Sequence, residues 1–187
     1  MKIMICGLTG TGKSTIAKAI AEAMNYEYIA SSKLLREFAG KNTSESQGFW
    51  ERKQGQEFLD DRLSSDIDEQ FDKKLLNIVD EKDNFVIDSW TMPWLYNGVA
   101  LRIYLKCPFL IRVNRVMLRD KLQEDVTKQA VKRKDLDTKK IFLQKYVFDI
   151  TKDLEPFDLV INTQYFDARS IILYILNYVK TVEKYYT

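Results

Sequence analysis

Residues 7–14 read Gly7-Leu8-Thr9-Gly10-Thr11-Gly12-Lys13-Ser14, the most informative motif of the sequence. It matches the pattern G-x-x-x-x-G-K-[ST], which is typical of a phosphate-binding loop (P-loop) when it joins a strand to a helix. The apolar run Lys2–Cys6 predicts a buried strand before it, and the apolar spacing over Lys13–Met24 predicts a helix after it. This context favours a P-loop over an accidental glycine-rich turn.

Each residue type in the loop has a physical task. The glycines let backbone N–H groups turn inward around a phosphate, and the N-terminus of the following helix adds positive potential. Lys13 would reach the β- and γ-phosphates of ATP as co-substrate, and the Ser14 hydroxyl would bind Mg²⁺ as cofactor. The predicted ATP-binding residues are Gly7, Leu8, Thr9, Gly10, Thr11, Gly12, Lys13, Ser14 and Thr15.

Strands and helices alternate along the rest of the chain. Further strands are predicted at Tyr26–Ala30, Phe85–Ile87, Ala100–Leu105 and Leu159–Ile161, and further helices at 31–39, 56–80, 109–122 and 167–186. This alternation predicts an α/β fold, the P-loop NTPase fold, with a five-stranded, mostly parallel sheet flanked by helices. The polar segment Gly40–Gly55 is expected to be mobile.

The composition excludes several classes of protein. The 187 residues, 45% hydrophobic and 30% charged, fit one globular domain. The chain has no histidine, which excludes Ser-His-Asp catalysis and His-ligated zinc. A formal net charge of +2 argues against a broad nucleic-acid surface, so nucleic acid is not expected as a partner.

Two features of the sequence bear on location. Cys6 and Cys107 lie far apart in apolar runs and are expected to be free thiols in a reducing compartment. No stretch approaches the roughly 20 apolar residues of a membrane span, and the N-terminal apolar run is too short for a signal peptide. We therefore expect a soluble, cytoplasmic protein without a membrane partner.

The strand Phe85–Ile87 runs into Asp88, the pattern of a strand that carries a magnesium-binding carboxylate beside a P-loop. Because ligands of open α/β sheets bind outside the carboxyl ends of the strands, Asp88 could hold Mg²⁺ through water or orient an acceptor. An ordinary aspartate in a turn is the alternative. A P-loop so early in a short chain favours a small kinase, and phosphoryl transfer needs no histidine.

Five segments together resemble a cytidylate kinase of the short archaeal type. They are the P-loop, residues 28–39, the strand ending at Asp88, residues 131–140 and residues 157–163. The resemblance runs in order from about residue 1 to 180 and is strongest at the P-loop. It implies transfer of a phosphoryl group from ATP to a small nucleotide, CMP or dCMP, giving CDP or dCDP.

The resemblance also implies the layout of the nucleoside monophosphate kinases in a single domain, 1–187. The core would comprise about 1–30, 81–122 and 141–187, the monophosphate-binding insert about 31–80, and the lid about 123–140. The lid arginines of the family converge on the transferred phosphoryl group, and the candidates here are Arg115, Arg119 and Arg133, which join Lys13 as the predicted catalytic residues.

The acceptor-binding residues implied by the resemblance are Ser31, Arg36, Asp88, Asp137 and Lys140. Ser31 and Arg36 match the serine and arginine after the second strand, and their spacing lets both face one cleft. Asp137 matches a ribose- or base-contacting acid. Lys140 stands where the family usually has arginine, and lysine cannot make a bidentate fork. Plain alternatives are a helix N-cap for Ser31 and solvated surface for Arg36 and for the helix face of Arg112, Arg115 and Arg119.

The largest departure from the family is Trp90, which stands where the family usually has an arginine that holds the monophosphate. Trp90 could stack on a base, although packing in the core or the site wall is favoured. This departure keeps open a kinase for another small acceptor, such as another nucleotide, a sugar acid or a cofactor precursor. A slow ATPase that acts as a switch or assembly factor on a protein partner also stays open, and a non-catalytic binding module is a remote third reading.

Overall fold

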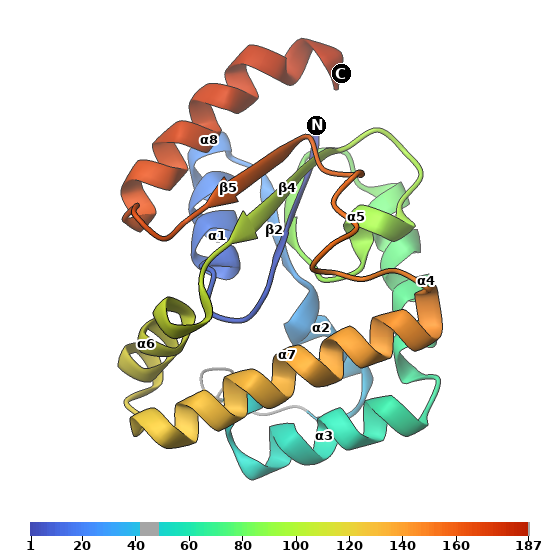
Figure 1. The fold of residues 1–187 in the computed structure, drawn as a ribbon. Coiled ribbons are helices and arrows are strands. Elements are labelled where there is room, and N and C mark those ends of the chain that lie inside the picture. Colours follow the sequence, from blue (N-terminus) through green and yellow to red (C-terminus); the bar gives the residue numbers. More distant parts are fainter. Residues whose placement is uncertain (42–48, 187) are drawn as a thin grey trace.

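The structure of the chain, a computed structural model, describes residues 1–41 and 49–186. A five-stranded sheet occupies its centre, with the strands in the order β2-β3-β1-β4-β5 (Figure 1). The strands are β1 (Lys2–Gly7), β2 (Glu27–Ala30), β3 (Phe85–Asp88), β4 (Leu101–Lys106) and β5 (Leu159–Asn162), and all neighbours are parallel. The predicted fold class is confirmed, and each predicted strand lies within one residue of the observed bounds.

Helices connect the strands and cover both faces of the sheet (Figure 1). They are α1 (Lys13–Met24), α2 (Ser31–Phe38), α3 (Lys53–Ser64), α4 (Ile67–Glu81), α5 (Met92–Leu95), α6 (Phe109–Asp120), α7 (Glu124–Tyr146) and α8 (Ala168–Val182), with 3₁₀ turns η1 (Phe49–Glu51) and η2 (Glu183–Tyr185). Because parallel strands need crossover connections, helices cover both faces, and the central strands β1 and β3 are buried almost throughout.

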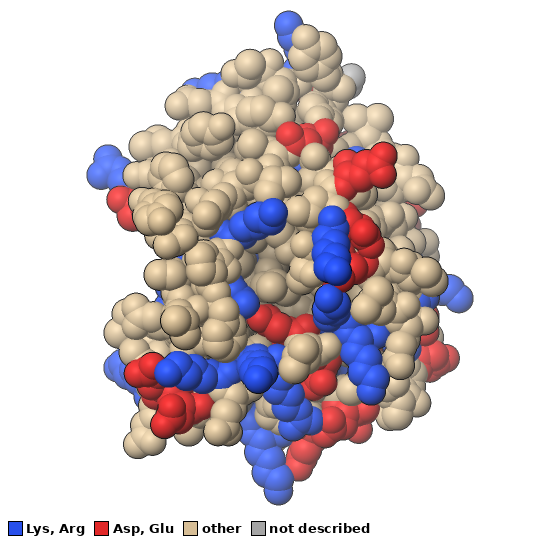
Figure 2. Space-filling view, in the orientation of Figure 1, with Lys and Arg blue, Asp and Glu red and all other residues tan. Residues whose placement is uncertain are grey.

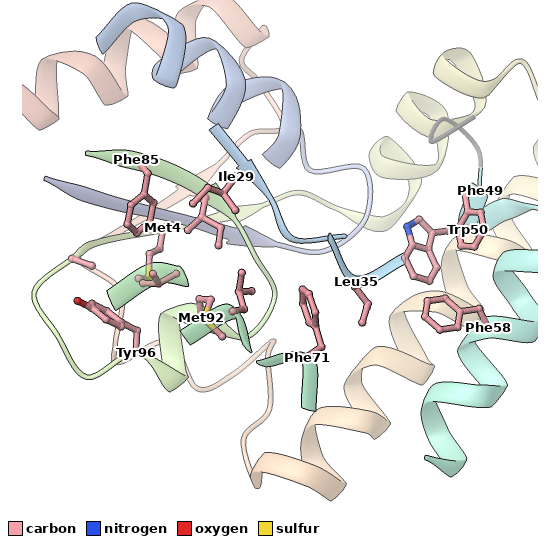
Figure 3. Close-up of a cluster of buried hydrophobic side chains, with 14 of the residues drawn as sticks. Met4, Ile29, Leu35, Phe49, Trp50, Phe58, Phe71, Phe85, Met92 and Tyr96 are labelled. Carbon is pink, nitrogen blue, oxygen red and sulfur yellow. The ribbon is translucent and has the colours of Figure 1, made fainter. Parts of the chain in front are cut away.

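The alternation of side chains along β1 shows how the core is divided. Ile3 and Ile5 point to one face, where they pack in a cluster with residues of α1 and α8. Met4 points to the other face and joins a cluster that includes residues of α2, α4 and α5. Figure 3 shows this second cluster reaching from the sheet, at Phe85, to Trp50 and Phe58 beside α3. The P-loop is thus anchored at the end of a strand that is buried on both faces.

The segment predicted as one helix over 56–80 forms two, α3 and α4. The break comes at Ser65 and Asp66, where the hydroxyls of Ser64 and Ser65 donate to the backbone carbonyl oxygen of Asp61 at 3.2 and 2.7 Å. Such local bonds compete with helical ones. Across the break, Arg62 Nε donates to Asp68 at 2.9 Å, and both side chains are buried.

Part of the segment Gly40–Gly55, predicted to be mobile, packs against the rest of the protein, while Arg52–Gln54 are exposed. Phe49 and Trp50 are buried in the core, and Gly55 belongs to α3. A Cβ on Gly55 would lie 2.1 Å from the carbonyl oxygen of Phe49, so only glycine allows η1 to lie this close to α3. The rest of the predicted mobile segment, residues 42–48, lies outside the described residues.

Helix α7 is continuous from Glu124 to Tyr146 and lies alongside α3 (Figure 1). The boundary that the sequence placed after residue 140, between a lid and a core segment, therefore falls inside a helix. Figure 2 shows Lys, Arg, Asp and Glu side chains gathered over the lower half of the molecule, where α7 and α3 lie.

Among residues 1–41 and 49–186, no helix combines the length and the apolar character needed to cross a membrane.

Candidate active site

The P-loop joins β1 to α1 in a conformation that depends on glycine. Gly10 and Gly12 have φ values of +79° and +99°, in the left-handed region. A Cβ on Gly10 would also lie 2.7 Å from the backbone carbonyl oxygen of Arg112 on α6. Thr11 closes the turn, because its hydroxyl donates to the carbonyl oxygen of Leu8 at 2.8 Å. The loop is thus wedged between α1 and α6 in the shape that an anion nest requires.

A cavity of about 720 Å³ opens over this loop. Its wall contains Thr9–Ile16, Tyr28, Ala30–Lys33, Arg36, Trp50, Asp88, Trp90, Arg115, Val116, Arg119, Lys134, Phe166–Ala168 and Ile171. Six of these residues are lysine or arginine and two are aspartate. The cavity therefore suits an anionic ligand, and its size falls within the range of small-molecule sites.

Lys13 projects into the cavity from the first turn of α1. Its ammonium donates to the carbonyl oxygen of Leu8 at 3.2 Å and lies 5.2 Å from the centroid of the Trp90 ring. Desolvation lowers the pKa of Lys13, and the Coulomb attraction of Cys6 and Asp88 opposes that shift. A lysine held in this way can exchange a weak carbonyl contact for a phosphate oxygen without moving its backbone.

Ser14 and Asp88 meet at the carboxyl end of β3. The Ser14 hydroxyl donates to Asp88 Oδ2, while Asp88 Oδ1 is buried and has no hydrogen-bond partner among the described residues. Burial raises the pKa of Asp88, and the bond from Ser14 and the charge of Lys13 oppose that rise. A hydroxyl and a carboxylate, one of whose oxygens is unpartnered, fit the donor set of Mg²⁺, which takes one or two protein ligands beside phosphate and water. No group of three or more His, Cys, Asp or Glu lies together within 1–41 and 49–186 to offer a different metal site.

The two predicted acceptor residues of α2 face the same cavity. Ser31 is the first residue of the helix and is buried in the cavity wall, while Ala30 is the N-cap, so the alternative of a serine cap is wrong. Arg36 is only 5% exposed, which excludes the solvated-surface alternative. Its guanidinium carbon lies 5.2 Å from the Phe49 ring centroid. Desolvation lowers the pKa of Arg36.

The three arginines of α6 separate into two kinds. Arg115 and Arg119 line the cavity; Arg115 donates to the side-chain and backbone oxygens of Thr163 at 2.9 and 2.6 Å, and Arg119 contacts Asp120. Arg112 is buried instead. It donates to the carbonyl oxygen of Thr9 at 2.8 Å and to Asp135 at 2.7 Å. Arg112 thus braces the P-loop, a role that the helical spacing did not indicate.

The predicted residues of α7 lie elsewhere. Arg133 is largely exposed and donates to Asp60 on α3 at 2.5 Å and to Asp137 at 3.3 Å. Lys140 is exposed, and none of Arg133, Asp137 and Lys140 lines the cavity. The side chain of α7 that does reach the cavity is Lys134. The structure therefore brings the P-loop, Asp88, Ser31, Arg36, Arg115 and Arg119 together, and leaves the three α7 predictions outside.

A sequence model of the cytidylate kinase-like family matches residues 2–165 of the chain. The chain belongs to the cytidylate kinase-like family. It is 33% identical over 190 residues to a cytidylate kinase of Saccharolobus islandicus, with 98% of this chain and 93% of the relative covered. A cytidylate kinase of Sulfolobus acidocaldarius is 31% identical over 184 residues, with 95% and 94% covered. The predicted resemblance, and with it an enzyme of the cytidylate kinase type, is confirmed.

A structural comparison bears on the fold of this cytidylate kinase-like chain. The shikimate kinase from Bacteroides thetaiotaomicron superposes with a TM-score of 0.59 at 16% identity, and the match covers 96% of this chain and 98% of that one. At this identity the similarity concerns the fold alone. The P-loop kinase architecture expected from the sequence is therefore present.

A small recess continues from the cavity of this family member into the protein. Its volume is about 50 Å³, and its wall includes Arg62, Asp68, Asp72, Thr91 and Thr138. Asp72 accepts hydrogen bonds from the hydroxyls of Thr91 at 2.8 Å and Tyr146 at 2.6 Å. Burial raises the pKa of Asp72 to about 6, against the effect of these two bonds. The recess extends the cavity on the side of α2 and α4, and its wall combines these buried polar groups with apolar side chains such as Phe71 and Phe142.

Trp90 lies at the border between the cavity and the recess. It lines the cavity and the recess, and its ring packs edge-on against Phe142 with centroids 6.2 Å apart. The favoured prediction of wall packing is therefore what the structure shows. Because the ring also faces the ammonium of Lys13, Trp90 belongs to the site as well as to the core.

Proposed function

We propose that the chain transfers a phosphoryl group from ATP, with Mg²⁺, to a nucleoside monophosphate, with CMP and dCMP as the acceptors. The observation that carries the proposal is that one cavity holds both the P-loop with Lys13 and the buried pair Ser31 and Arg36. Donor and acceptor groups on one wall allow direct, in-line transfer between two bound ligands. The full-length similarity to archaeal cytidylate kinases supports cytidine nucleotides as acceptors.

On the donor side, the P-loop amides and the ammonium of Lys13 would bind and orient the β- and γ-phosphates. Ser14 and Asp88 are the residues that would hold Mg²⁺, which when bound neutralises charge on the phosphate oxygens. Arg112 fixes the loop through Thr9 before ATP binds, so that the amides need no rearrangement. Preorganised positive groups of this kind supply most of the stabilisation in phosphoryl transfer.

On the acceptor side, Arg36 offers a planar fork to the monophosphate, and Ser31 a hydroxyl next to it. Arg115 and Arg119 face the cavity from α6, where they could neutralise charge on the group in transit. Arg133, Asp137 and Lys140 would act only if α7 moved toward the cavity, and we retain them as proposed lid residues on that condition. Closure of this lid, about 123–140, over the insert, about 31–80, would exclude the water that otherwise accepts the phosphoryl group.

The location of the reaction is also part of the proposal. We infer that the enzyme acts in the cytoplasm on small nucleotides, since Cys6 and Cys107 are both free thiols, as a reducing compartment allows.

The second candidate function is that of a kinase for another small acceptor. Trp90 favours this function, because an indole in the cavity wall cannot make the two parallel hydrogen bonds to a phosphate that arginine makes.

The test is a panel of CMP, dCMP, UMP, AMP and GMP, with ADP release and product identity measured in one assay. Diphosphate formed from CMP and dCMP well above the other three supports the proposal. ADP release that is equal across the panel, accompanied by inorganic phosphate, contradicts it and favours a slow ATPase. Chelation of Mg²⁺ is expected to abolish the CMP-dependent signal.

A further inference from the structure

Five residues belong to the walls of both the cavity and the recess: Ser31, Ser32, Trp50, Trp90 and Lys134. They form the junction between the two spaces. Lys134 carries the charge among these five, and it is 9% exposed although lysine is rarely buried. A buried ammonium at the entrance to a second space requires an explanation beyond helix packing.

The aromatic rings of the junction hold this ammonium. Lys134 Nζ lies 4.5 Å from the centroid of the Trp50 ring and 5.6 Å from that of Trp90. Trp50 is in turn stacked on Phe58, with centroids 5.8 Å apart and an interplanar angle of 19° (Figure 3). Ring faces attract a cation without demanding one hydrogen-bond geometry. The rings therefore help to keep the ammonium at the junction, where an anion bound in the cavity can reach it.

Two other cations of the cavity lie against aromatic rings of the same region. The ammonium of Lys13 lies 5.2 Å from the same Trp90 ring centroid, so the P-loop and α7 each bring a lysine to one indole. Arg36 lies against the neighbouring Phe49 ring. Burial lowers the pKa of both Lys13 and Arg36, and an anion bound beside them would offset this cost of desolvation. The ligand that fits is a phosphate monoester placed between Lys13 on the donor side and Arg36 on the acceptor side.

We propose that Lys134 binds the monophosphate of the acceptor, and that Trp50 and Trp90 are positioning residues that keep its ammonium at the junction. The proposal rests on the proposed function only in that the acceptor carries a phosphate monoester. The competing structural role is support of α7: burial raises the pKa of the neighbouring Asp135, and the charge of Lys134, together with Arg112, opposes that rise. That role would affect stability and not the difference between a nucleotide and its nucleoside.

The test compares Lys134→Met, which keeps an unbranched stem but removes the charge, with Lys134→Arg, which keeps the charge. Lys132→Met, an exposed lysine on the same helix, is the matched control. Calorimetric binding of CMP and of cytidine is measured for each protein, together with thermal unfolding. We expect Lys134→Met to weaken CMP binding about 30-fold, as for loss of one charge-assisted hydrogen bond, with cytidine binding unchanged. On a logarithmic scale, Lys134→Arg should weaken CMP binding by less than half as much as Lys134→Met does. Lys132→Met should not weaken it.

The rings are tested in the same assay. Trp90→Leu should weaken CMP binding about threefold, the size of one cation–π contact, and Trp90→Phe should restore it. CMP affinity within twofold of the wild type in Lys134→Met overturns the proposal. So does an equal loss for CMP and cytidine, because the effect would then not concern the phosphate.

Wild-type turnover separates this inference from the proposed function. If the wild type does not phosphorylate CMP, the binding series is repeated with whichever of dCMP, UMP, AMP and GMP binds it most tightly, against the matching nucleoside. A phosphate-dependent loss in Lys134→Met then supports the inference although the proposed acceptor is wrong. A wild type that binds none of the five monophosphates overturns the inference as well.

Discussion

Arg112 offers the sharpest test of how the P-loop is held. The substitution Arg112→Met removes the bonds to Thr9 at 2.8 Å, Cys107 at 3.1 Å and Asp135 at 2.7 Å. The two side chains of the ion pair are only 5% and 16% exposed, so the substitution leaves the Asp135 carboxylate buried and unpaired. Breaking one partner of such a pair costs about 3–5 kcal/mol. For a domain of this size, each kcal/mol lowers Tm by about 2–4 °C, which gives a fall of about 6–20 °C.

The assay is thermal unfolding of four proteins: the wild type, Arg112→Met, Asp135→Asn and the double variant. Because most of the cost comes from the unpaired carboxylate, the double variant should be more stable than the sum of the single changes predicts, by about 1–3 kcal/mol. Losses that are additive would show that Arg112 and Asp135 are not coupled. A Tm for Arg112→Met within about 2 °C of the wild type, which corresponds to about 1 kcal/mol or less, would show that the ion pair does not hold the loop. Weaker ATP binding in Arg112→Met at a temperature where it stays folded would show that the brace also serves the loop.

Three further predictions concern individual groups. Gly10→Ala should lower ATP affinity at least about tenfold, because its Cβ would lie 2.7 Å from the Arg112 carbonyl oxygen and its φ is +79°. The control in the same titration is Gly40→Ala, whose φ of +66° is similar but which has open space around it. Asp88→Asn should lower kcat about 100-fold with little change in metal-free ATP binding, and unchanged turnover would remove Asp88 from the magnesium site. The pKa of Asp72 is raised from 3.8 to about 6 in the folded state, so its ionisation costs stability as pH rises through this interval, and the full cost is reached above about pH 6. Asp72→Asn should therefore raise Tm relative to the wild type more at pH 7 than at pH 5, and an equal difference at both pH values would contradict the assignment.

The strands, most of the helices and the P-loop could be predicted from the sequence, because residues close together in the chain determine them. The strand β1, the glycines of the P-loop and the apolar stripe of α1 are close in sequence, so the motif and its context could be identified together. Asp88 could be predicted because the carboxyl ends of parallel strands share one edge of the sheet. The break between α3 and α4 was missed, since the apolar spacing continues across it while two serine hydroxyls interrupt the helix.

The rest of the site depends on contacts between distant residues, which no local pattern contains. Arg112 and Thr9 are 103 positions apart, and their bond turns an arginine on a charged helix face into a buried brace. Lys134 stands next to Arg133, yet the rotation of α7 places Lys134 between two tryptophans and Arg133 on the surface against Asp60. The prediction of Arg133 followed the family motif, and the one hint of Lys134 was its helical spacing with the buried residues Ala130, Thr138 and Ile141.

Transfer of the γ-phosphoryl group of ATP to CMP can be followed with a label on that group. With γ-labelled ATP, Mg²⁺ and CMP, the account predicts that the label appears in CDP, that its appearance depends on CMP, and that Lys13→Ala abolishes most of it while the protein stays folded. Label found only as inorganic phosphate, at a rate independent of CMP, would contradict the account, as would near-normal transfer by Lys13→Ala.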